Sequence, residues 1–138
     1  MTTIPAKSVA SQRFITSRQL LPGDWANGVT DLLTSTQTAT ASTTQTQAGG
    51  TDITAAAVKV TTANANDAVT LPKGYPGLEI FIANISANTL GVFPAVDDTI
   101  FPSAQDAVIT QTASKNAVYK CINVNAAGDA TWYQLEGT

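Results

Sequence analysis

The sequence predicts an all-β fold, a small antiparallel β-sandwich or jelly-roll-like domain preceded by an extended N-terminal arm with one short helix. Three observations lead to this prediction. From residue 51 onward, short apolar runs alternate with turn clusters and show no helical period. Residues 34–50 contain neither a charge nor a large apolar side chain. The chain has 138 residues, enough for one ordinary domain plus an extension.

The arm, residues 1–33, ends in a short helix predicted at about 24–33. Pro22-Gly23 marks a turn, and Asp24 is a suitable N-cap. One apolar stripe follows at spacings of i, i+4, i+7 and i+8, formed by Trp25, Val29, Leu32 and Leu33. Because ten residues form only a marginal helix in isolation, this stripe needs a partner surface, either its own domain or another subunit.

A second feature of the arm is an alternating patch between two arginines. Arg13 and Arg18 bracket Phe14-Ile15-Thr16-Ser17, a pattern that can add as a strand to the edge of a partner's sheet. The arginines are suited to carboxylates on a protein partner. The predicted partner-anchoring residues of the arm are therefore Arg13, Phe14, Ile15, Arg18, Trp25, Val29, Leu32 and Leu33.

The composition of residues 34–50 predicts a Thr/Ser/Gln-rich linker that cannot fold alone. Threonine at every second position from 34 to 40 also allows an extended strand on a neighbour's edge.

Residues 51–138 form the predicted β-domain. Its turn clusters are rich in Gly, Pro, Asn, Asp and Ser, the residues that close hairpins. The predicted strands are residues 55–61, 68–71, 78–84, 89–93, 99–101, 107–111, 116–123 and 131–135. Eight strands over this length are typical of a β-sandwich, a jelly roll or a small barrel.

The composition argues against an enzyme. Histidine is absent, which removes Ser-His-Asp and Cys-His catalysis and nearly every ordinary zinc site. Cys121 lies in an apolar run and is interpreted as a buried small side chain. Glu79 and Glu136 are a poor acid–base pair, because Glu79 belongs to an alternating strand that turns it toward solvent. We therefore expect no catalytic residue and no cofactor.

Asp97-Asp98 with Asp106 is a candidate calcium site, since three carboxylates close in sequence can supply oxygen ligands. The segment lacks a glycine-spaced loop of the EF-hand type. These residues are therefore predicted to be solvated turn carboxylates, and no metal is expected.

The charge distribution bears on the class of partner. Residues 1–50 carry three basic and two acidic side chains, whereas residues 51–138 carry four basic and eight acidic ones. An acidic body repels nucleic acid, and three spaced cations are too few to grip it. No apolar stretch reaches the ~20 residues of a membrane span or the length of a secretory signal core. We expect folding in a cytoplasm, with neither nucleic acid nor membrane as partner.

Five segments of the β-domain carry a resemblance. They are Ala-Val-Thr-Leu-Pro at 68–72, Gly-Leu-Glu-Ile-Phe-Ile-Ala-Asn at 77–84, Asn-Thr-Leu-Gly-Val-Phe-Pro-Ala at 88–95, Asp-Thr-Ile at 98–100 and Asp-Ala-Thr-Trp-Tyr at 129–133. Together they resemble a small β-domain of tailed-bacteriophage virion proteins of the capsid decoration, cement or head-fibre type. Asp97 stands where that pattern usually has Gly, and Phe101 where it often has Asn.

The resemblance implies a virion structural protein, found at the capsid surface and made in the host cytoplasm. The arm would bind the major capsid protein or other virion subunits, and the β-domain would be displayed. Because capsid sites repeat around symmetry axes, a homo-oligomer, either a trimer or a dimer, is expected.

The alternative is a receptor- or glycan-binding module of a head or tail fibre, or a tail or neck component. That function would use Tyr75 and Tyr133 as exposed recognition aromatics at loop tips. Trp132 and Tyr133 are adjacent in a strand, so they are expected to point to opposite faces.

Overall fold

The computed structural model describes residues 13–14, 20–21 and 35–137. All of the secondary structure in these residues is β, and they contain no helix. The chain divides into two compact units, Met1–Ser35 and Thr36–Thr138.

In the first unit, the described residues form one small antiparallel pair. Strand β1 (Arg13–Phe14) pairs with β2 (Leu20–Leu21), with Arg13 opposite Leu21 and Phe14 opposite Leu20. Arg13 and Phe14, the two described residues of the patch predicted to add to a partner's sheet, are thus paired within the arm. The predicted helix at 24–33 lies outside the described residues, as do six of the anchoring residues: Ile15, Arg18, Trp25, Val29, Leu32 and Leu33.

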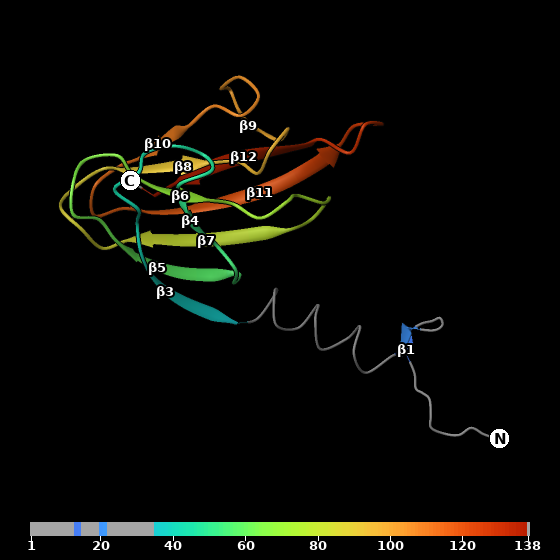
Figure 1. Ribbon diagram of the computed structural model, residues 1–138, viewed down its shortest axis with the longest axis horizontal. Coiled ribbons are helices and arrows are strands. Elements are labelled where there is room, and N and C mark those ends of the chain that lie inside the picture. The colour runs from blue at the N-terminus through green and yellow to red at the C-terminus, as the bar shows by residue number, and fades with distance from the viewer. Residues whose placement is uncertain (1–12, 15–19, 22–34, 138) are drawn as a thin grey trace. The chain divides into compact units, whose positions relative to one another are not determined.

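The second unit contains two sheets of four and six strands (Figure 1). The four-stranded sheet has the order β10-β8-β6-β4, formed by Ile109–Gln111, Leu90–Phe93, Asp67–Thr70 and Thr51–Asp52. The six-stranded sheet has the order β3-β5-β7-β11-β12-β9, formed by Thr36–Thr40, Ala57–Thr61, Glu79–Asn84, Asn116–Val124, Ala130–Glu136 and Thr99–Phe101.

Both sheets are mixed, so the prediction of an antiparallel fold was wrong. From β3 to β11, consecutive strands alternate between the two sheets. Neighbours such as β5 and β7, or β6 and β8, are therefore separated by one strand of the other sheet. Two reversals of direction make such neighbours parallel, as their registers show. The turn signals indicate where the chain reverses but not in which sheet it continues.

The predicted strands from residue 55 onward are confirmed, with ends that differ by a few residues, and 99–101 matches β9 fully. The predicted linker is not confirmed. Strand β3 pairs in parallel with β5 over five residues, and Ala39 and Ala41 are buried. The β-domain therefore begins near Thr36 instead of residue 51.

Amide side chains hold the rest of the predicted linker against the domain. Gln47 Nε2 donates to the Pro94 carbonyl oxygen at 2.9 Å, and Gln45 Nε2 donates to the Ala65 carbonyl oxygen at 2.9 Å. Composition misled the prediction because a segment at a sheet edge can be fixed by small side chains and hydrogen bonds, without large apolar groups.

The core lies along one face of the six-stranded sheet and in the four-stranded sheet. Buried side chains alternate along β7 and β11, whereas all four residues of β6 are buried. The largest buried side chains include Trp132, Tyr119, Ile80, Ile82, Leu90 and Val92.

A buried amide joins the two sheets within this core. Gln111 in β10 donates from Nε2 to the carbonyl oxygen of Ile82 in β7 at 3.0 Å. The Tyr119 hydroxyl in β11 donates to Gln111 Oε1 at 3.0 Å, and itself accepts a hydrogen bond from Gln134 Nε2 at 2.9 Å. Burial raises the pKa of Tyr119, so its hydroxyl remains a donor.

Candidate functional site

Within the acidic segment that contains Asp97, Asp98 and Asp106, the Asp98 side chain has a structural role. The Asp98 carboxylate is completely buried and accepts hydrogen bonds from Lys73 Nζ, from the Gly74 N–H at 3.0 Å and from the Ala130 N–H at 2.8 Å. It therefore ties the loop between β6 and β7 to the start of β12. The prediction of a solvated turn carboxylate was wrong for Asp98, because backbone donors and a lysine take the place of water.

Two further carboxylates hold loops in the same way. Asp106 Oδ1 accepts from Gln47 Nε2 at 2.9 Å and from the Asp97 N–H at 2.7 Å. Asp67 Oδ2 accepts from the Asn64 N–H at 2.8 Å and from the Ala63 N–H at 2.9 Å. The Gln47 hydrogen bond lowers the pKa of Asp106, and the Asn64 backbone hydrogen bond lowers that of Asp67.

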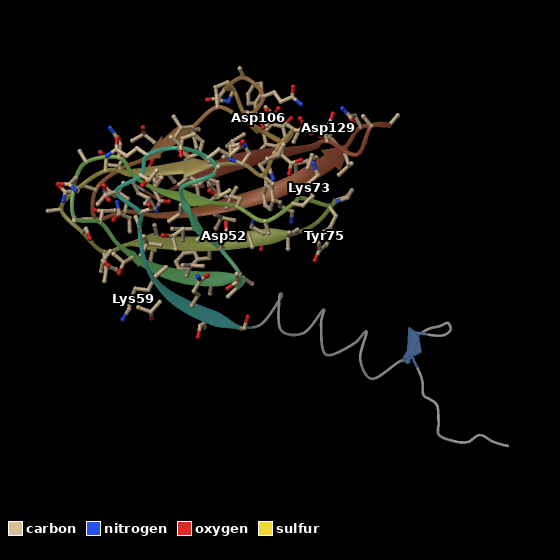
Figure 2. The ribbon with its side chains drawn as sticks, viewed as in Figure 1. Asp52, Lys59, Lys73, Tyr75, Asp106 and Asp129 are labelled. Carbon is tan, nitrogen blue, oxygen red and sulfur yellow. The ribbon has the colours of Figure 1, made fainter. Side chains whose placement is uncertain are left out.

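The acidic residues near Asp98 were compared with the geometry that a metal ion needs. Figure 2 shows Lys73 and Asp129 close together at one end of the domain, where the Asp98 hydrogen bond raises the pKa of Lys73. Within residues 13–14, 20–21 and 35–137, no group of three or more His, Cys, Asp or Glu side chains is arranged to hold a metal ion.

The other residues considered for chemistry are Glu79, Glu136 and Cys121, and each has different surroundings. Glu79 is exposed, as predicted, and Lys120 Nζ lies 3.2 Å from its Oε2. Glu136 instead accepts a hydrogen bond from the Thr112 N–H at 2.7 Å. Cys121 is buried, as predicted, and burial raises the pKa of its thiol.

The two tyrosines predicted as recognition aromatics occupy different kinds of surface. Tyr75 is exposed in the loop between β6 and β7, as predicted (Figure 2). Tyr133 lies inside β12 and not at a loop tip, so that part of the prediction was wrong. Its ring packs against Phe101 with the centroids 5.3 Å apart. Trp132 is buried and Tyr133 is exposed, which confirms that they point to opposite faces.

Tyr133 belongs to the outer face, our name for the side of the six-stranded sheet that faces away from the core. Alternation along each strand places the members of this face. Its apolar members are Ala57, Phe81, Ala83, Phe101, Val118, Ile122, Tyr133 and Leu135, and its charged members are Lys59, Glu79 and Lys120. Figure 2 shows Lys59 on the opposite side of the domain from Asp106.

Strand register arranges the outer face into rows. Phe81 is opposite Ala57 on one side and Val118 on the other, and Val118 is opposite Leu135. This apolar row therefore crosses four strands without interruption. In the next row, Glu79 is opposite Lys120. An apolar row and a charged row thus run side by side across the centre of the sheet.

The apolar row is exposed and uneven. Leu135 is 75% exposed and Phe81 is 41% exposed. A hollow of about 430 Å³ lies on one side of Phe81, lined by Val118, Leu135 and Gly137 among others. A second hollow of about 310 Å³ lies on the other side, lined by Ala57, Lys59 and Ala83 among others. Phe81 thus forms a ridge between two hollows.

Sequence reasoning missed the outer face, although one signal for it was present. Ile80, Phe81 and Ile82 are three consecutive apolar residues, which places apolar side chains on both faces of β7. A strand that is half solvated normally alternates instead. The run therefore indicates a second apolar face.

The outer face has the character of a contact surface, because the free energy falls when another surface covers apolar side chains that are gathered on one sheet.

In the part of the chain that the structure describes, no helix is long and apolar enough to cross a membrane. No family model matches the chain, and no curated protein matches it.

Proposed function

We propose that this chain is a structural protein of a tailed-bacteriophage virion, a capsid decoration or cement protein. Its β-domain stands on the particle surface, and its N-terminal arm binds the major capsid protein or neighbouring virion subunits. The observation that carries the proposal is the exposed apolar row of the outer face, Ala57, Phe81, Val118 and Leu135. A surface of this kind suits a protein that works by contact with other subunits.

The use of polar groups inside the domain supports the same function. Asp98, Asp67 and Gln111 are buried, and their hydrogen bonds go to groups of the domain itself. Such groups stabilise loops and the junction between sheets, and they do not converge on a shared cleft. This arrangement fits a rigid building block better than a catalyst.

A β-sandwich or jelly-roll-like packing of the two sheets belongs to this proposal. Gln111 in β10 reaches both β7 and Tyr119 in β11, so it spans from one sheet to the other. The buried faces of the two sheets would then enclose the core between them. The resemblance of segments 68–72 and 129–133 to virion β-domains agrees with such a packing.

The arm supplies the attachment in this proposal. The stripe of Trp25, Val29, Leu32 and Leu33 would bury against a capsid subunit, and the arginines at 13 and 18 would meet its carboxylates. Repetition of the attachment site around capsid symmetry axes would bring copies of the chain together as dimers or trimers.

A receptor- or glycan-binding module is the second candidate, and one observation favours it. The ring of Tyr75 is exposed in a loop bounded by Gly74 and Gly77, the kind of position that recognition aromatics occupy. In that case the Tyr75→Ala variant would lose binding to cell surfaces or to a glycan array, whereas binding to capsids would not depend on Tyr75.

Deletion of residues 1–33 tests the proposed function. Co-sedimentation with phage capsids that lack this protein should recover the full chain and should not recover the deletion variant. Circular dichroism and cooperative thermal unfolding should show that the variant keeps its β-domain, because the deletion ends before β3. The Tyr75→Ala variant is the matched control and should bind capsids as the full chain does. Equal capsid binding by the deletion variant would rule out the arm as the anchor.

A further inference from the structure

We propose that the outer face is a homotypic interface, on which two copies of the chain pack face to face about a two-fold axis. The axis lies parallel to the strands and runs between β7 and β11. The inference concerns self-association through the β-domain, and it goes beyond capsid binding by the arm. Either one can fail in experiment while the other holds.

The charged row determines where the axis lies. A two-fold rotation about this axis exchanges the positions of β7 and β11 and leaves the height along the strands unchanged. Because Glu79 and Lys120 are register partners on these two strands, each Glu79 then faces Lys120 of the second copy. The pair within each chain, at 3.2 Å, becomes part of a ring of four alternating charges.

Another two-fold axis leaves the charges unmatched. An axis perpendicular to the strands and passing over Phe81 would place the Glu79 position of one copy over the Ala83 position of the other. Covering a carboxylate with an alanine removes water without replacing its hydrogen bonds. The parallel axis is therefore the one that the charges of the outer face favour.

The shape of the apolar row fits the same axis. The rotation that pairs Glu79 with Lys120 also places Phe81 of each copy over Val118 of the other. Val118 lines the hollow of about 430 Å³ between Phe81 and Leu135. A dry cavity of about 150 Å³ is enough to hold a benzene ring, so this hollow accepts the incoming phenyl group. Each copy thus offers both a ridge and a matching hollow.

The size of the face indicates a weak dimer. Six strands at the usual spacing span about 24 Å, and a strand of five or six residues, the length of β3, β5 and β7, spans about 17–20 Å. Two such faces bury on the order of 1,000 Å² in total, which is the lower limit for a specific interface. The axis keeps the strands of both copies roughly aligned, as in ordinary packing of one sheet on another.

Sedimentation equilibrium of the full chain tests the proposal. Over roughly 5 to 500 µM, the range that suits weak association, the average mass should rise from 14.3 kDa toward twice that value. Leu135→Lys should weaken dimerisation at least tenfold, because it places a charge in the covered apolar row. Val96→Lys is the matched control, since Val96 is exposed outside the strands of the sheet, and it should dimerise as the wild-type chain does.

Charge exchange tests the position of the axis. Glu79→Lys gives each face only positive charges in this row, and Lys120→Glu gives each face only negative ones, so each variant alone should dimerise at least tenfold more weakly. An equimolar mixture of the two should restore a one-to-one heterodimer, because each lysine then faces a glutamate of the other copy. The charge pair within each chain is not restored in that mixture, so recovery reports the contact between chains.

Three outcomes would overturn the proposal. The wild-type chain could remain monomeric over the whole range, which would leave the arm or another subunit to cover the face. The Leu135→Lys variant could dimerise as tightly as the wild-type chain, which would place the dimer contact elsewhere. The mixture of charge variants could remain monomeric, which would exclude the axis between β7 and β11.

Discussion

The two faces of the six-stranded sheet are built from similar side chains and differ in what covers them. On β7, Ile80 and Ile82 are completely buried, whereas Phe81 between them is 41% exposed. On β12, Trp132 is buried and Tyr133 next to it is exposed. Apolar character alone therefore does not tell which face belongs to the core. The inner face is buried within the domain, whereas apolar side chains of the outer face are exposed in the described domain.

Polar groups follow the same division. On the inner side, Tyr119 is held between Gln111 and Gln134 by two hydrogen bonds. On the outer face, Glu79 and Lys120 pair with each other while both side chains remain about half exposed. Most buried polar groups are hydrogen-bonded within a fold, whereas exposed ones can rely on water. Among the described residues, the buried Trp132 Nε1 and Thr62 Oγ1 are exceptions without a hydrogen-bond partner.

The largest expected effect comes from truncating neighbours on opposite faces of β12. Trp132→Ala should lower the free energy of unfolding by about 3–5 kcal/mol, because it leaves a cavity in the core. Tyr133→Ala should lower it by no more than about 1 kcal/mol, because it removes a ring that is partly in water and packs against Phe101. Urea unfolding at low protein concentration would measure both without a contribution from dimers. Similar losses for the two variants would contradict the division of the faces.

A smaller effect is expected from single hydroxyl groups. Tyr119→Phe should cost about 1–2 kcal/mol, because it leaves the buried Oε1 of Gln111 without its donor. Tyr133→Phe on the outer face is the matched control and should change stability by less than about 0.5 kcal/mol. The same urea experiment measures both. If Tyr119→Phe leaves the free energy of unfolding unchanged, the hydrogen bond between Tyr119 and Gln111 does not contribute to stability.

The most graded effect is the response to acid. The pKa values of Asp67 and Asp106 are lower in the folded chain than their ordinary value of 3.8. Their stabilisation is therefore complete above about pH 4 and is lost as the pH falls through the folded values, where the native state must take up protons. Thermal unfolding between pH 7 and 2.5 should show this loss. In the Asp67→Asn variant the stability should change less with pH below 4. If the pH dependence of the variant is unchanged, Asp67 does not contribute to the loss of stability in acid.

Most of the strand positions in the β-domain could be predicted from the sequence, because alternation and turn residues are local properties. The segment 99–101 and the turn before β12 are examples. The candidate site could not be predicted in the same way. Phe81 was seen only as part of an alternating strand, and its exposure depends on the absence of covering residues within the described domain. The predicted strand at 131–135 already contains Tyr133, but only the pairing of β12 with β9 shows that its ring packs against Phe101.

By itself the sequence determined that the chain folds as strands from about residue 55 onward, that Cys121 is buried, and that Trp132 and Tyr133 point to opposite faces. Only the tertiary structure decided which strands are neighbours and in which direction they run. It also assigned β3 to the domain and decided which apolar face is sealed. The physical reason is that strand formation follows from neighbouring residues, whereas pairing and burial follow from contacts between segments far apart in the chain.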